Sequence, residues 1–197
     1  EKPVVAGMRS VAASAGYMIA LGTDQIFARE GTITGSIGVI IESAEVTELA
    51  KKLGVKPIIV KSNTLKSTLS PLEKASPESL AVVQTLIDDF YNRFVDIVAN
   101  SRKLPRNEVV EVANGSVYSG ARALELKLID AIGGETEAIK WLQTKRKIPA
   151  NLEVIDQKVR PENDILAQLN QTIFGKFLQN SSLKLDGLMA IWHPNLY

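Results

Sequence analysis

Short apolar runs alternate with amphipathic runs along the first sixty residues. Residues 4–9 (VVAGMR) have the pattern of a buried strand, and residues 15–21 have the spacing of a short helix that ends near Gly22. The pattern then predicts strands at residues 24–28, 36–42 and 56–60, and a helix at 44–53 with Ser43 as its cap and Lys51, Lys52 and Gly54 at its end.

The longest predicted helix covers residues 77–103, where apolar side chains recur at steps of three and four from Leu80 to Val98. Beyond it the pattern predicts helices at 106–113, 121–126 and 135–145, and strands within NGSVYSG, at 128–130 and at 152–155. Strands that alternate with helices predict an α/β fold with substantially parallel pairing.

The pattern changes after Arg160 and Pro161. Residues 163–178 and 183–191 are amphipathic and have no strand between them. We therefore expect a main domain at residues 1–160 and a C-terminal helical tail at 161–197. The tail has several interpretations: a helix docked on its own domain, a subunit contact, a segment that lies on a membrane surface, or a cover for an active site.

Composition excludes several classes of protein. Of the 197 residues, 45% are hydrophobic and 23% charged, and 23 lysines and arginines face 22 acids, so neither disorder nor a highly charged partner such as nucleic acid is indicated. No apolar run reaches the roughly eighteen residues of a membrane span, and no signal peptide opens the chain. Since the chain opens directly on a strand, we expect a fragment of a longer protein.

Cysteine is absent, which excludes thiol catalysis, disulfides and thiolate metal sites. The single histidine, His193, lies five residues from the end, where it is a poor candidate for a Ser-His-Asp triad. A catalytic serine in this chain therefore needs another base.

Ser14 is the candidate nucleophile. It lies between small residues, Ala12-Ala13-Ser14-Ala15-Gly16, at a predicted strand-to-helix transition. A hydroxyl there stands at the end of a sheet, and the free N–H groups of the following helix point toward a developing oxyanion. The structural alternative is a helix cap in a small-residue turn, since serine is also a favoured cap.

Lysine is the remaining candidate for the base. A lysine that accepts the serine proton must be neutral, so its pKa has to fall from about 10.4 to roughly 7 or 8, which requires desolvation. Lys66 has Leu65 and Leu69 near it in an otherwise polar loop, and Lys61 directly follows an apolar strand. Spacing alone does not choose between these two lysines.

Four segments resemble the signal peptide peptidase A family, which consists of membrane-associated serine proteases. They are SVAASAGYMIALGTDQIFA, TGSIGVIIES, VKSNTLKSTLSP and ANGSVYSGARALELKLID, and their order and separation also match, over roughly residues 4–142. The resemblance implies a Clp protease/crotonase-like fold, which is a spiral of ββα units that assembles into rings.

The resemblance also implies a Ser/Lys dyad. Position by position, the family's nucleophile falls on Ser14 and its base on Lys66, which is 66 − 14 = 52 positions further along the chain. The serine of its T-G-S-x-G segment falls on Ser36, whose hydroxyl then orients the lysine. Lys61 becomes the first lysine of its segment, with a structural role.

The chain departs from the family pattern at two points. Ala15 stands where the family has glycine, and the family's upstream glycine-rich segment, which supplies an oxyanion donor, is not in this sequence. The backbone N–H of Ser14 is then expected to form part of the oxyanion hole. Loss of one such donor typically costs about a hundred- to a thousandfold in rate.

No metal or organic cofactor is expected. Asp88, Asp89 and Asp96 match no ligand spacing, and Gly133-Gly134 lacks the lysine and serine that follow a phosphate loop. The resemblance instead implies an endopeptidase for apolar peptides such as released signal peptides. It also implies a homo-oligomer with substrate grooves completed between subunits, and a site at the bacterial cytoplasmic membrane through an N-terminal anchor, with the catalytic domain on the extracytoplasmic side. The alternatives are a crotonase-like acyl-CoA enzyme and an inactive oligomeric scaffold.

Overall fold

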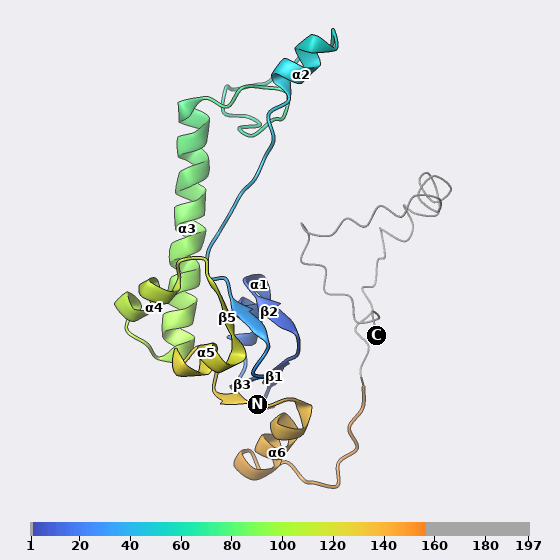
Figure 1. The fold of residues 1–197 in the computed structure, drawn as a ribbon, viewed down its shortest axis with the longest axis vertical. Coiled ribbons are helices and arrows are strands. Elements are labelled where there is room, and N and C mark those ends of the chain that lie inside the picture. Colours follow the sequence, from blue (N-terminus) through green and yellow to red (C-terminus); the bar gives the residue numbers. More distant parts are fainter. Residues whose placement is uncertain (1, 157–197) are drawn as a thin grey trace, which may run out of the picture. The chain divides into compact units, whose positions relative to one another are not determined.

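The structure is a computed structural model that describes residues 2–156. Residues up to Leu152 form one compact unit. It contains two small three-stranded sheets with helices beside them (Figure 1). The predicted C-terminal tail lies outside the described residues.

The first sheet is entirely parallel. Its order is β1 (Val5–Met8), β3 (Gln25–Ala28) and β6 (Ala131–Ile132), and Val5 pairs with Gln25. Parallel strands need crossover connections, and helix α1 (Ala15–Ala20) lies in the connection from β1 to β3. The predicted α/β class with parallel pairing is therefore confirmed at this level.

The second sheet has the order β2 (Val11–Ala13), β4 (Ile33–Gly35) and β5 (Val117–Ser119). Strands β2 and β4 are parallel, and β4 and β5 are antiparallel. Two buried threonines hold these strands, Thr34 within this sheet and Thr32 to the end of β1 in the first sheet. Thr34 donates its hydroxyl to the carbonyl of Ala12 (2.7 Å), and Thr32 donates to that of Arg9. These bonds satisfy polar groups that burial would otherwise penalise.

Helix α3 (Pro77–Arg102) organises the core. It begins after Ser76, whose hydroxyl accepts the N–H of Ser79 (3.1 Å), and it ends at Lys103 in the left-handed conformation. Its second half packs into the core, and its buried side chains there are Phe94, Val95 and Val98. Figure 1 shows this part of α3 beside α4 (Arg106–Val112) and α5 (Gly120–Glu125).

A partly buried ion pair ties the end of α3 to the first sheet. The Arg102 guanidinium donates to both carboxylate oxygens of Asp130 (2.6 and 3.1 Å), and Asp130 also accepts the N–H of Ile26 in β3 (2.7 Å). A bidentate arginine–carboxylate pair with an additional backbone donor is among the stronger polar contacts in proteins. It holds the segment before β6 against β3.

Several predicted elements are confirmed. Helices α3, α4 and α6 (Glu135–Lys145) lie within one residue of their predicted bounds, and β1, β3, β5, α1 and α5 also lie where the pattern placed them. The strand predicted at 128–130 is shifted, since Leu128 and Ile129 are buried core residues and the strand begins at Ala131.

Three predicted strands are wrong. Residues 36–42, 56–60 and 152–155 form neither helix nor strand, although they are rich in β-branched residues. A strand needs a hydrogen-bonded neighbour, and in the described part of the chain these segments have none. Helix α2 (Thr47–Lys52) is shorter than predicted and begins after Val46, and Ser43 donates its hydroxyl to the carbonyl of Leu69 rather than capping a helix.

Among the helices of residues 2–156, none has the length and apolar character needed to cross a bilayer.

Candidate active site

Ser14 lies where strand β2 ends and helix α1 begins. Its backbone has φ 51° and ψ −118°, and its side chain is half-buried. A non-glycine residue with positive φ costs free energy and is held there only by its surroundings. The conformation turns the chain sharply from strand to helix and presents the serine at the carboxyl end of the sheet.

Ser36 occupies the equivalent position on the neighbouring strand. It directly follows β4 and also has a positive φ, of 50°. Since Ala13 pairs with Gly35 in parallel register, the two serines that follow are neighbours at the same sheet edge. The structure therefore brings together Ser14 and Ser36, two of the three predicted catalytic residues.

Backbone hydrogen bonds hold both serines. Ser14 N–H donates to the carbonyl oxygen of Gly35 (2.8 Å), and Ser36 N–H donates to that of Ser116 (2.8 Å). The N–H of Ser14 is thus already used, and its expected role as an oxyanion donor is not supported. Because the first N–H groups of a helix have no intrahelical acceptor, the next candidate donor is the N–H of Ala15, the first residue of α1.

Gly35 supports this arrangement because it has φ 78° and lies under the ring of Tyr118. A Cβ on Gly35 would stand 2.6 Å from Cδ2 of that ring and 3.1 Å from the Ser116 carbonyl oxygen. The ring is held in turn by its hydroxyl, which donates to the carbonyl of Val112 (3.0 Å). The sequence analysis did not identify Gly35 as a residue that shapes the site. The order Thr34-Gly35-Ser36 after the apolar Ile33 was the signal that could have indicated it.

We expect Gly35→Ala to destabilise the fold by about 2–3 kcal/mol, since the new methyl group overlaps Tyr118 and alanine disfavours positive φ. Urea unfolding followed by circular dichroism measures this change. Gly31→Ala is the matched control, because nothing lies within 4 Å of its added Cβ. Equal stability of the two variants would show that Tyr118 does not constrain Gly35.

Lys66, the third predicted catalytic residue, is not beside Ser14. It is exposed on a turn, where its N–H donates to the carbonyl of Asn63 (3.0 Å). Within residues 2–156, no hydrogen bond or ion pair joins its ammonium group to either serine. Figure 1 shows the loop between α2 and α3 beside the first turns of α3, away from α1 and β2.

Lys61 has a different environment from Lys66. Its ammonium group donates to both oxygens of Glu73 (2.8 Å each), and about a quarter of each side chain is exposed. This pair closes the loop that carries Lys66, which agrees with a structural role for Lys61. It also leaves Lys66 as the lysine of this loop without a carboxylate partner in the described residues.

Tyr17 follows Ser14 by three residues but faces the core. It is fully buried, and its hydroxyl donates to the carbonyl of Leu128 (2.7 Å). Burial raises the pKa of Tyr17 well above its usual range, an effect that nearby Arg102 partly offsets. Tyr17 therefore stays protonated and anchors α1 rather than acting as a base.

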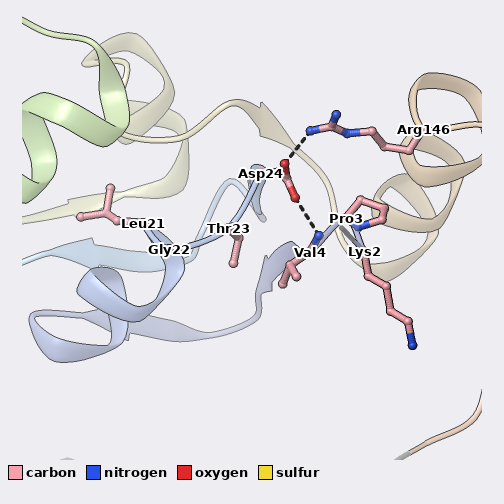
Figure 2. A pocket seen from close by; sticks show the side chains of 8 residues that line it. All are labelled: Lys2, Pro3, Val4, Leu21, Gly22, Thr23, Asp24 and Arg146. Atoms are coloured by element: carbon pink, nitrogen blue, oxygen red, sulfur yellow. Dashed lines mark hydrogen bonds and ion pairs between the residues drawn. The ribbon is translucent and has the colours of Figure 1, made fainter.

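An open hollow of about 650 Å³ lies at another place, between the first residues and the end of α6 (Figure 2). Its Asp24 carboxylate accepts the N–H of Val4 (2.8 Å) and pairs with Arg146 (2.6 Å). None of Ser14, Ser36 and Lys66 lines it. Its two most closely placed charged groups, Asp24 and Arg146, are thus engaged with each other.

Across residues 2–156, histidine, aspartate and glutamate side chains form no cluster of three or more that could hold a metal ion. The hydroxyls of Ser14 and Ser36 and the first residues of α1 lie at the strand ends.

Comparison with known proteins identifies relatives. The family model described as Peptidase family S49 matches residues 1–149. "Putative signal peptide peptidase SppA" of Enterococcus faecium is 41% identical over 156 residues, which cover 79% of this chain and 45% of that protein. "Serine protease SPPA, chloroplastic" of Arabidopsis thaliana is 34% identical over 179 residues, 88% of this chain and 26% of that protein. These matches confirm the resemblance inferred from four segments of the sequence.

The chain spans less than half the length of these two relatives. Among solved structures, a mutant form of the 1510-N membrane-bound stomatin-specific protease matches with 18% identity and a TM-score of 0.33, covering 66% of this chain and 49% of that one. A TM-score of this size is too low to establish a shared fold, so the Clp protease/crotonase-like spiral stays a prediction.

Proposed function

Because this chain belongs to peptidase family S49, we propose that it is the catalytic part of a serine endopeptidase in which Ser14 is the nucleophile. The observation that carries the proposal is the pair of serines at neighbouring strand ends, each held at positive φ by a backbone hydrogen bond. Family membership indicates the reaction class, peptide-bond hydrolysis. The position of Ser14 at the start of α1 supports its hydroxyl as the attacking group.

The proposed mechanism begins with attack of Ser14 Oγ on the carbonyl carbon of the scissile peptide bond. The Lys66 amine accepts the hydroxyl proton, and the N–H of Ala15 donates to the oxyanion that forms. The protonated lysine then gives that proton to the leaving amine, and water hydrolyses the acyl-enzyme. Ser36, beside Ser14, orients the lysine amine.

We propose that Lys66 reaches Ser14 from a second copy of the chain. Within one copy the lysine lies on an exposed turn that makes no contact with the serine pair. A homo-oligomer, implied by the family resemblance, would bring the loop of one subunit to the strand ends of another. Each active site then contains Ser14 and Ser36 from one copy and Lys66 from its neighbour.

The proposed substrates are extended apolar peptides such as released signal peptides. The extended segment after Ser36 supports this choice, because its backbone is not paired in a sheet and Ile40 and Ile41 are exposed. An extended peptide can pair with such a segment as an added strand while its side chains contact the isoleucines. We place the activity at the bacterial cytoplasmic membrane, with the catalytic domain on the extracytoplasmic side.

Mixing two inactive variants tests this proposal. Ser14→Ala and Lys66→Ala are each expected to be inactive on a fluorogenic apolar peptide that the unmodified chain cleaves. In a 1:1 mixture, about a quarter of the sites receive both intact residues if copies assemble at random, so activity should return to roughly that fraction.

A mixture that stays inactive, while sedimentation shows that the two variants assemble together, would place the dyad within one chain. An unmodified chain that cleaves no apolar peptide would contradict the proposed function itself. Circular dichroism of each variant serves as the control for folding.

A further inference from the structure

Exposed apolar side chains are concentrated in the middle of the chain. Of the twenty-three large hydrophobic side chains exposed within residues 2–156, thirteen lie between residues 39 and 90. Contiguous exposed apolar surface is uncommon on monomers and marks association sites. Two parts of this region are opposite to each other in net charge.

The first part, here called the stripe, is one row along the first half of α3. Val82, Leu86 and Phe90 are spaced by four residues, lie on one face of the helix, and are each about half exposed. Glu78 begins the same row, and Asp89 lies seven residues after Val82, two turns along that face. Residues 77–91 contain three carboxylates and no lysine or arginine.

The second part, here called the arm, consists of residues 47–60: α2 and the extended segment after it. Leu53, Ile58 and Val60 are 71%, 90% and 93% exposed. The arm contains Lys51, Lys52 and Lys56 against one glutamate, so its net charge is 3 − 1 = +2. The hydrogen bond from Val46 N–H to the Pro71 carbonyl (2.8 Å) fixes its base to the loop that leads into α3.

We infer that the arm of one copy docks on the stripe of a second copy. Both surfaces remain exposed within one chain, so the arm does not cover its own stripe. The two surfaces are both apolar and are opposite in charge, which favours one pairing and disfavours arm–arm and stripe–stripe contacts. Because the two surfaces differ, the contact is heterologous: each copy binds one neighbour through its arm and another through its stripe. Repetition of this contact builds a ring or a filament.

A lipid bilayer is the other apolar, charged surface to consider. The arm alone has the charge to bind anionic lipid, whereas the carboxylates beside the stripe would be repelled by it. A second copy accounts for both surfaces with one contact. The inference rests on the proposed function, because the two-copy active site also requires a homo-oligomer. It adds the two surfaces through which the copies of that oligomer bind each other.

Charge reversal on each side tests this contact. The arm variant contains Lys52→Glu and Lys56→Glu, and the stripe variant contains Glu78→Lys and Asp89→Lys. The unmodified chain should sediment as a multiple of its 21.4 kDa mass. Each variant alone should associate at least about tenfold more weakly, because its arm and stripe then have like charges. A 1:1 mixture should recover the association, since each arm again meets a stripe of opposite charge.

The matched control has the same change in charge away from the stripe, as Asp88→Lys with Glu111→Lys, and should associate like the unmodified chain. A monomeric unmodified chain, unweakened variants, or a mixture that fails to recover would each overturn the inference. So would loss of binding to phosphatidylglycerol vesicles by an arm variant of unchanged mass, which assigns the arm to lipid. All masses are measured with Ser14→Ala in the background, so failure of the proposed catalysis leaves this result unaffected.

Discussion

Replacement of Ser14 by alanine is expected to lower the rate of peptide cleavage by a factor on the order of 10⁴ or more, which is the usual consequence of removing a nucleophile that acts with its base as a unit. The serine stands at a strand end with φ 51°, next to Ser36 and at the start of α1. Ser36, the neighbouring serine, is followed by an extended segment rather than by a helix.

Ser10→Ala is the matched control, because Ser10 is exposed directly before β2 and its hydroxyl makes no hydrogen bond within residues 2–156. It should cleave at the rate of the unmodified chain. A fluorophosphonate probe gives a second measurement, since it reacts with activated serines without needing a peptide. Labelling that persists in Ser14→Ala and disappears in Ser36→Ala would exchange the roles of the two serines.

Helices α3 and α6 were predictable because each has its own local signal. Helix α3 combines a hydroxyl cap, a proline in its first turn and apolar residues at steps of three and four. Helix α6 begins where the Glu137 carboxylate accepts the N–H of Gly134 (2.7 Å), a hydrogen bond that lowers the pKa of Glu137. Such signals lie within a few residues of one another and do not depend on distant partners.

The strands were less predictable because pairing decides them. Strands β2 and β4 each have three residues, too few for an alternating pattern, and they are strands because their backbones pair with each other in parallel, with Ala12 opposite Thr34. Residues 36–42 and 56–60 have the composition of strands but lack a partner in the described part of the chain. Composition alone did not distinguish the two cases.

The candidate site was predictable only in part for the same reason. The resemblance assigned Ser14 and Ser36, and parallel register places them side by side. Nothing local in the sequence indicates that the N–H of Ser14, the expected oxyanion donor, donates to the carbonyl of Gly35 on the neighbouring strand. The position of Lys66 depends on a surface outside its own chain if the two-copy proposal holds.

Replacement of Lys66 by alanine is expected to lower the rate of cleavage by about 10²–10⁴-fold, the contribution typical of a general base. A small primary amine added to the assay should restore part of the activity of Lys66→Ala, since it takes the place of the missing amine.

Two lysines of the same loop region are the controls for this experiment. Lys74 is exposed, and Lys74→Ala should cleave at the unmodified rate. Lys61→Ala loses the pair with Glu73, so it should lower stability while the folded variant still cleaves the peptide. If cleavage instead persists in Lys66→Ala and disappears in folded Lys61→Ala, then Lys61 is the base and the carboxylate of Glu73 must release it when substrate binds.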